Sequence, residues 1–284
     1  MKILLQVLII LLFYNILVYF IPGDQVDFLM GNFSDEEKNL LRESFHLKKD
    51  FLFQLKNSFV SFFSLNLGYS YVKQEFISNI LFEHILTTLK LSFSIFLCIF
   101  FITFLFSFLF TYFSLSLIKK IFFSLMSIPS FILGSLGLYF FSYKYYLFPL
   151  GGDSSFFLPA ISFGIPSSSY ITKQIIDLLA QEKESHYIRF QKSLGISSLF
   201  LLMLKNILVQ IIGILTSYAI SILGGLVVIE RIFDIPGVGF LLNEAISTRD
   251  FPLVQAILFY NLIIIFIFLN FSLFIQKKVD KRLC

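Results

Sequence analysis

The chain has 284 residues, of which 57% are hydrophobic and only 14% are charged, and its mean hydropathy is +0.85. This composition excludes an ordinary soluble domain, in which about a quarter of the residues carry a charge. The net charge of +4 comes from 22 basic and 18 acidic residues that are dispersed along the chain, which excludes the concentrated basic surface of a nucleic-acid-binding protein.

Residues that could support metal or covalent chemistry are few and scattered. Cys98 and Cys284 are far apart in sequence, and His46, His84 and His186 have no other ligand at a metal-binding spacing. The motifs H-E-x-x-H, C-x-x-C and G-x-S-x-G are absent from the sequence. The sequence therefore predicts no catalytic residues, no metal site and no enzyme activity.

Six charge-free stretches are long enough to cross a membrane, because about 20 apolar residues span the hydrocarbon core. The sequence thus predicts an all-α integral membrane protein with six transmembrane helices, at residues 3–21, 91–118, 121–143, 154–172, 206–229 and 251–276. The first stretch starts with Lys2, as a signal peptide would. It is longer than the usual apolar region of a signal peptide and no small-residue cleavage site follows, so we interpret it as a retained helix.

The long segment 22–90 follows the first helix and is predicted to lie outside the membrane. Acidic residues near Asp35 precede Phe-rich patches interleaved with polar residues, which is typical of an amphipathic helix at an interface. The segment can be a cap over the helices or a surface for an external partner, and both alternatives remain open. We divide the chain into residues 1–90, the first helix with this segment, and residues 91–284, a five-helix core.

The fourth stretch is the most interrupted, since Pro159, Gly164 and Pro166 are followed by three serines. Neighbouring helices can accommodate such interruptions inside a bundle. Lys and Arg in the short loops then set the orientation, because cytoplasmic loops carry the excess of these residues. One side holds Lys2, Lys119, Lys120, Lys173, Lys183, Arg189, Lys192, Lys205, Lys277, Lys278, Lys281 and Arg282, and the other holds Lys144, Arg231 and Arg249. Both termini are therefore predicted to be cytoplasmic.

The largest cytoplasmic connection, within residues 173–205, is predicted to contain a short amphipathic helix. Tyr187, Phe190 and Leu194 share one face at helical spacing, and Gly195 would end the helix because glycine tolerates the left-handed conformation. From the pattern alone, the segment can also be an ordinary basic loop whose apolar residues contact lipid headgroups.

A resemblance to a known family extends this interpretation. Tyr187-Ile-Arg-Phe-Gln-Lys-Ser-Leu-Gly195, followed by Lys205-Asn206, resembles the EAA loop of ABC-importer permeases of the dipeptide and oligopeptide branch. In that family the loop is the coupling helix that sits in a groove of the ATPase subunit. The resemblance implies that the loop at 181–205 contacts the ATPase, through Glu184, Tyr187, Arg189, Phe190, Lys192, Ser193 and Gly195.

Other segments resemble the B-type inner-membrane subunit of the same branch and cover nearly the whole chain. They are Ile21-Pro-Gly-Asp24, Leu67-Gly-Tyr-Ser-Tyr71, Ile128-Pro-Ser-Phe131, Leu158-Pro-Ala160, Glu230-Arg-Ile-Phe-Asp-Ile-Pro-Gly-Val-Gly239 and Arg249-Asp-Phe-Pro-Leu-Val-Gln255. The chain departs from the family where Gln191 replaces Ala, where Gln210 replaces Pro, and where Lys281 replaces the Pro of an Asp-Pro-Arg sequence. These departures concern local helix geometry.

The segment after the fifth span contains a predicted turn. Pro236 presets φ and Gly237 tolerates a positive φ, which is the chemistry of a type II turn. The resemblance implies an external loop near the dock of the binding protein, with Glu230, Phe233, Pro236, Gly237 and Gly239 as candidates. A turn that only reverses the chain is the alternative, with Glu230 marking the end of the span because a charge in mid-membrane is costly.

If transport is driven directly by ATP, the energy source must lie on another chain, because no G-x-x-x-x-G-K-[ST] motif is present. The resemblance implies an ATP-driven ABC importer in the bacterial inner membrane. Its parts would be a second permease subunit, two cytoplasmic ATPase subunits that bind the ATP, and an external substrate-binding protein, with no cofactor in this chain. Peptide is the predicted cargo, and related permeases carry dipeptides, longer peptides, nickel or sugars.

Two other classes remain as alternatives. A secondary transporter would show ionisable residues in mid-span, and the interiors of the six predicted spans have none. A membrane enzyme acting on lipids would need a cluster of His, Asp, Glu or Ser side chains at the interface.

Overall fold

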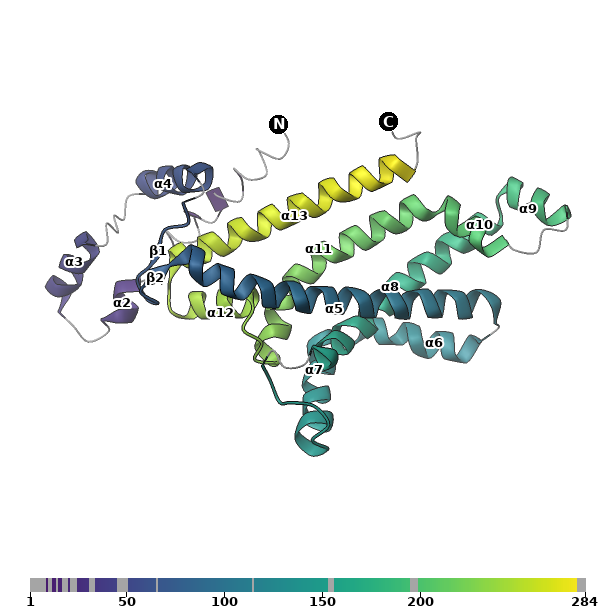
Figure 1. Ribbon diagram of the computed structural model, residues 1–284, viewed down its shortest axis with the longest axis horizontal. Coiled ribbons are helices and arrows are strands. Elements are labelled where there is room, and N and C mark those ends of the chain that lie inside the picture. Colours follow the sequence, from purple (N-terminus) through teal and green to yellow (C-terminus); the bar gives the residue numbers. More distant parts are fainter. Residues whose placement is uncertain are drawn as a thin grey trace. The chain divides into compact units, whose positions relative to one another are not determined.

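The computed structural model describes residues 25–30, 34–44, 51–64, 66–113, 115–152, 156–194 and 199–279, together with positions 9, 12, 13, 15, 16 and 20. Helices predominate in these residues, as the predicted all-α class requires (Figure 1). The strands in the described part are β1 (Tyr69–Ser70) and β2 (Glu75–Phe76), which form a two-residue antiparallel ladder. Most of the first predicted span, 3–21, lies outside the described residues.

The chain forms two compact units. The first unit comprises residues 1–86 and 237–264, and the second comprises residues 87–236 and 265–284. Two long helices, α5 (Ile77–Tyr112) and α13 (Phe251–Val279), contribute residues to both units. The functional division at residue 90 stays a prediction.

The described part of the first unit contains four further helices: α2 (Gln25–Leu29), α3 (Asp35–Ser44), α4 (Phe51–Ser64) and α12 (Val238–Ser247). Helix α3 begins with a capping box, in which the Ser34 backbone N–H donates to Glu37 Oε2 at 3.0 Å and the Glu37 N–H donates back to Ser34 Oγ at 3.4 Å. Its last turn carries Arg42, which forms an ion pair with Asp27 of α2 at 2.6 Å. The acidic start of segment 22–90 therefore folds as a capped helix.

A small apolar core holds this unit together. Ile77, Ile80 and Leu81 at the start of α5 pack with residues of α12 and α13 that are also buried, among them Leu241 and Leu253. Burial of one such Ile or Leu side chain stabilises a fold by roughly 1.5–3 kcal/mol. The core therefore joins the end of segment 22–90 to residues far along the chain.

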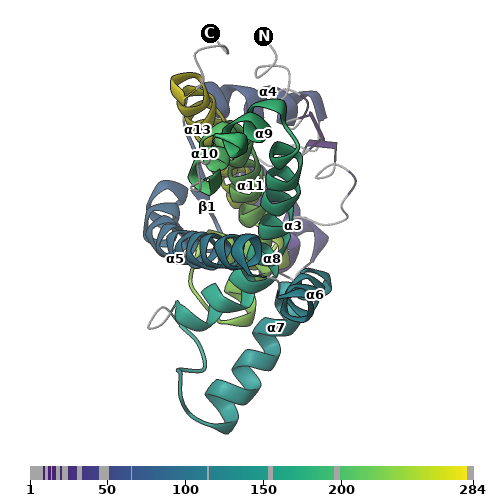
Figure 2. The ribbon, with the colours of Figure 1, turned by 90° about the vertical axis from the view of Figure 1, so that its right-hand side faces the viewer.

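The second unit contains α6 (Ser116–Ser124), a 3-10 turn at Leu125–Ser127, α7 (Ser130–Gly137), which continues as a π-helical segment at Leu138–Lys144, α8 (Phe157–Lys183), α9 (His186–Ser193), α10 (Leu199–Asn206) and α11 (Leu208–Ile232). Helix α8 packs against α6, α7, α9, α10 and α11, so it is the centre of the unit (Figure 2). The apolar core of the second unit also includes Leu91, Ile95 and Ile99, which form one buried stripe of α5 with four-residue spacing.

Three of the described helices, α5, α11 and α13, are long and apolar enough to cross a membrane. A fourth crossing is present if the bent pair Ser116–Ser127 and Ser130–Lys144 counts as one span. Helix α8, the predicted fourth span, is not among them because serines and a threonine interrupt its apolar sequence. These side chains are buried, and Ser162 and Ser167 donate to carbonyl oxygens one turn earlier in α8, at 2.7 and 2.6 Å.

The span predicted at 121–143 is bent, because the helix axis turns by 97° at Ile128-Pro129. Ile128 is extended, with ψ of 120°, as expected for a residue that precedes proline. The short loop predicted to hold Lys119 and Lys120 is misplaced. Both lysines lie inside α6, and the connection from α5 falls a few residues earlier, after Tyr112.

Candidate functional site

A groove of about 860 Å³ lies inside the second unit, between the bend before α7 and the helices α8 and α11. Its walls consist of Met126, Ile128, Pro129, Ser130, Phe163, Pro166, Ser167, Tyr170, Gln174, Gln210, Gly213, Ile214, Ser217, Tyr218 and Ser221. Non-helical backbone at membrane depth is tolerated where it lines a cavity or is covered by protein. The bend at Pro129 meets this condition, because Ile128, Pro129 and Ser130 line the groove.

The groove is polar but uncharged. Its hydroxyl and amide groups come from four serines, two tyrosines and two glutamines, and no Asp, Glu, Lys, Arg, His or Cys is among the lining residues. The rings of Tyr170 and Tyr218 face each other across α8 and α11, with centroids 5.8 Å apart. Hydroxyls and amides both donate and accept hydrogen bonds, so this surface can bind a polar solute without attracting ions of one sign.

None of these lining residues was predicted from the sequence as a site, although Gln210, Pro166 and the segment 128–131 were named for other reasons. A periodic signal was available: Ser167, Tyr170 and Gln174 follow one face of α8. Gln210, Ser217 and Ser221 do the same on α11, within apolar stretches that otherwise face lipid or the core. The spacing shows which residues share a face, but not that the two faces meet.

The segment predicted to be cytoplasmic contains the predicted short helix, α9, which lies at the end of α8 beside α10 (Figures 1 and 2). Ile188 is 2% exposed and packs in the core of the second unit. Phe190 and Leu194 are 64% and 62% exposed. Phe190 and Leu194 of the predicted apolar face therefore project from the unit, whereas Tyr187 packs against its core.

The other predicted coupling residues divide into three groups. Glu184, Arg189 and Ser193 are exposed, and Tyr187 is half-buried. The side chain of Lys192 and the whole of Gly195 lie outside the described residues. The predicted helix stop at Gly195 is thus not described, and α9 itself ends at Ser193.

Three polar side chains connect α9 to its neighbours. The Tyr187 hydroxyl donates to Glu182 Oε1 of α8 at 2.5 Å, and Asn206 Nδ2 of α10 donates to the same oxygen at 3.1 Å. Asn206 Nδ2 also donates to the Tyr187 hydroxyl. Desolvation, reinforced by the hydrogen bond to Glu182 and its charge, raises the pKa of Tyr187 to about 12. The phenol is therefore neutral near pH 7 and keeps the proton that it donates.

Most of the predicted external dock is buried. Glu230 is fully buried in α11 and accepts a hydrogen bond from Thr88 Oγ1 at 2.8 Å, and Phe233 is buried beneath the loop that precedes α8. The Phe233 carbonyl accepts from the Gly152 N–H at 3.0 Å. Gly237 and Gly239 are buried as well, and Pro236 is exposed.

The type II turn predicted at Pro236-Gly237 is wrong. Gly237 is extended, with φ of −106° and ψ of −177°, and its carbonyl accepts the Leu241 N–H at 2.9 Å to begin α12. The positive φ of this segment, 50°, occurs instead at Asp234, a residue type that tolerates the left-handed region. The chain therefore reverses before Pro236, and Gly237 is the N-cap of a helix.

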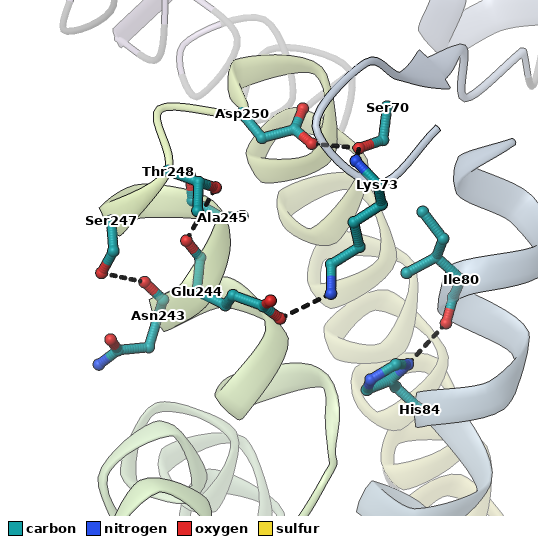
Figure 3. A network of polar contacts seen from close by, with 10 residues as sticks. All are labelled: Ser70, Lys73, Ile80, His84, Asn243, Glu244, Ala245, Ser247, Thr248 and Asp250. Carbon is teal, nitrogen blue, oxygen red and sulfur yellow. Dashed lines mark hydrogen bonds and ion pairs between the residues drawn. The ribbon is translucent and has the colours of Figure 1, made fainter. Parts of the chain in front are cut away.

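A polar network in the first unit joins two segments that both resemble the permease family (Figure 3). Ser70 of the β1–β2 hairpin donates to the Asp250 carboxylate, and Asp250 Oδ1 accepts the Leu253 N–H at 3.3 Å, as an N-cap of α13 does. Lys73 forms an ion pair with Glu244 of α12 at 2.7 Å. The network attaches the hairpin to α12 and to the start of α13.

Comparison with known proteins agrees with this architecture. Residues 116–283, more than half of the chain, match the model of a family described as "Binding-protein-dependent transport system inner membrane component". The chain is also similar to the nickel import system permease protein NikB of Staphylococcus aureus strains USA300, NCTC 8325 and bovine RF122. Each is 28% identical in an alignment that covers 93% of this chain and 85% of the relative.

These relatives are transport permeases and not enzymes, in agreement with the sequence prediction. The match includes the bent segment, the helices that form the groove and helix α9. The predicted membership of the peptide and nickel branch of ABC-importer permeases is confirmed. The chain belongs to the family of inner membrane components of binding-protein-dependent transport systems.

Proposed function

We propose that this chain is one of two permease subunits of an ATP-driven importer and that it couples to separate ATPase subunits through residues 181–205. The observation that carries the proposal is the exposed apolar face of α9, with Phe190 64% exposed on a helix that Ile188 anchors in the second unit. An apolar side chain on a rigidly held helix is suited to insertion into a groove of a partner protein. ATP is bound by the partners, and this chain carries no cofactor.

The groove between α7, α8 and α11 is proposed as this subunit's part of the transport path. It is lined by hydroxyls and amides in a unit whose outer helices are apolar, as a polar path through a membrane requires. The second permease subunit would line the remaining part of the path, and an external binding protein would deliver the cargo. The residues proposed as the docking site of this binding protein are Glu230, Phe233, Pro236, Gly237 and Gly239, of which Pro236 is exposed.

Peptide is the proposed cargo. The main chain of a peptide offers both N–H donors and carbonyl acceptors, which the serine, tyrosine and glutamine side chains of the groove can pair. Nickel is the second candidate, because the similar proteins are named nickel import permeases. A bare nickel ion prefers imidazole, thiolate or carboxylate ligands, which the groove lining lacks, so nickel would have to pass with its own ligands.

The coupling role is tested by Phe190→Ala in the complete importer, purified in mild detergent and assayed in membrane vesicles. Because a buried aromatic anchor at an interface is worth about 2 kcal/mol or more, we expect retention of the ATPase subunits to fall by about tenfold or more. ATP-dependent uptake should fall with it. The matched control is Phe76→Ala in the hairpin, since Phe76 is 63% exposed and is predicted to lie on the external side.

Undiminished ATPase retention and uptake in a normally inserted Phe190→Ala protein would contradict the coupling role. The same wild-type vesicles distinguish the cargoes, using radiolabelled trialanine and radiolabelled Ni²⁺ in parallel. ATP-dependent uptake of trialanine supports the proposed cargo. Uptake of Ni²⁺ without trialanine would reverse the cargo assignment while leaving the coupling role in place.

A further inference from the structure

We infer that Glu182, Tyr187 and Asn206 form a latch that makes α9 move as one body with the two helices lining the groove. The inference rests on the proposed coupling role of α9 and names the residues that transmit its motion. All three would be positioning residues, since they act through the helices that they connect.

Each hydrogen-bond donor of the latch has an acceptor within it. The Tyr187 hydroxyl donates to Glu182 Oε1 at 2.5 Å, and one hydrogen of the Asn206 amide reaches the same oxygen at 3.1 Å. The second amide hydrogen is available for the Tyr187 oxygen. Hydrogen bonds to an ionised carboxylate are stronger than those between neutral groups, so Glu182 is the centre of the ring.

The latch joins α8, α9 and α10 at the end of the second unit from which α9 projects. Glu182 is in the last turn of α8, Asn206 is the last residue of α10, and α11 begins two residues later at Leu208. The buried residues Leu179, Ile188 and Ile207 pack in one core at this point. A displacement of α9 is therefore passed to both α8 and α11.

The same two helices form opposite walls of the groove. Gln174 of α8 lies two turns before Glu182, and Gln210 of α11 lies one turn after Asn206. Helices of this length move as stiff rods, so a shift at the latch changes the position of the groove side chains. The packing of Ile188 and Tyr187 against the core holds α9 in place, and the directional hydrogen bonds set its angle to α8 and α10.

The test measures transmission and does not depend on the cargo. A cysteine replaces Ser217 in the groove of a Cys98→Ala, Cys284→Ala protein, which is purified with its partner subunits. The maleimide alkylation rate of that cysteine is measured with and without ATP and vanadate. Tyr187→Phe, which removes only the hydroxyl, should reduce the nucleotide-dependent change in rate by about threefold or more, because one such hydrogen bond shifts an equilibrium by about two- to tenfold.

ATPase retention and vanadate-trapped nucleotide are measured in the same samples, and both should stay near wild-type levels. A merely structural role for Tyr187 would lower these quantities together with the alkylation response. Tyr146→Phe is the matched control, since Tyr146 is 81% exposed in the loop before α8. Glu182→Gln keeps an acceptor oxygen for Tyr187 and should retain more of the response than Glu182→Ala.

Asn206→Ala provides a second variant at an exposed position, where the fold tolerates truncation. A full alkylation response in both Tyr187→Phe and Asn206→Ala would overturn the latch while leaving the coupling role intact. Failure of the wild-type chain to retain ATPase subunits at all would overturn the proposed function, and the latch with it.

Discussion

At the scale of single residues, glycines set how closely the helices of the second unit approach. A side chain at Gly225 of α11 would place its Cβ 2.4 Å from Cε2 of Phe163 on α8, closer than any real contact. At Gly164 the Cβ would lie 2.6 Å from Sγ of Cys98 on α5. Gly224, the neighbour of Gly225, has open space around its Cβ position. Small residues at such crossings allow close backbone packing in membrane proteins.

These two adjacent glycines form a matched pair for mutation. Gly225→Ala should lower the free energy of unfolding by about 1–3 kcal/mol, because the buried Phe163 ring must move. Gly224→Ala should cause no loss, and its higher helix propensity should stabilise α11 by up to about 1 kcal/mol. Thermal unfolding in detergent, followed by far-UV circular dichroism, measures both changes. Equal shifts for the two variants would contradict the predicted contact.

At the scale of secondary-structure elements, the β1–β2 hairpin depends on a buried carboxyl. Asp250 is fully buried, and this burial raises the pKa of its carboxyl, partly opposed by the hydrogen bonds from Ser70 and Leu253. Lys73 and Glu244 are the nearby charges, and they act in opposite directions. Because the folded pKa exceeds the unfolded value of about 3.9, the protonated carboxyl favours folding. This contribution is lost as pH rises through the folded pKa.

Hydrogen exchange of residues 70–76, corrected for intrinsic rates, tests this pH dependence. Protection of the hairpin should decrease as pH rises above about 4 and level off once Asp250 is ionised. Asp250→Asn, which cannot ionise, should remove the decrease. Glu244→Gln is the control, because it removes only a partly exposed ion pair with Lys73 and should keep the decrease. Protection that increases with pH would contradict the raised pKa.

At the scale of the whole molecule, the charges at the two ends of the second unit support the proposed orientation. Glu182 meets Asn206 at one end of α8 and α11, and Gly152 meets Phe233 at the other, so the two helices are antiparallel. The first end carries Lys183, Arg189 and Lys205, and the second end carries Lys144 and Arg231. The positive-inside rule then assigns the end with α9 to the cytoplasm.

The orientation is tested by thiol labelling of intact cells. In a Cys98→Ala protein, a membrane-impermeant maleimide should label Tyr146→Cys, in the predicted external loop, and should leave the native Cys284 unlabelled. Permeabilised cells should show labelling of both positions, which controls for reactivity. Labelling of Cys284 from outside intact cells would contradict the proposal that the termini are cytoplasmic.

The sequence by itself determined that this is a membrane protein, that it is helical and to which family it belongs. Long apolar runs indicate membrane-spanning segments whatever the tertiary structure. Such segments are helical, because backbone polar groups buried in lipid must form hydrogen bonds within the segment. The Tyr187, Phe190 and Leu194 pattern likewise predicted the helix α9, since its charged and apolar residues follow a local period. Glu230 was assigned to the end of a span for the same reason, and α11 ends two residues after it.

Only the tertiary structure decided which faces meet. Pro129 signals an interruption, but the 97° bend and the groove that it lines depend on packing against α8. The conformation of Gly237 depended on the start of α12, because glycine permits several conformations and its neighbours select one. Glu182, Tyr187 and Asn206 are separated along the chain, so their side chains come together only when α8, α9 and α10 pack. Local sequence sets the period of a helix, whereas contacts between helices require the whole fold.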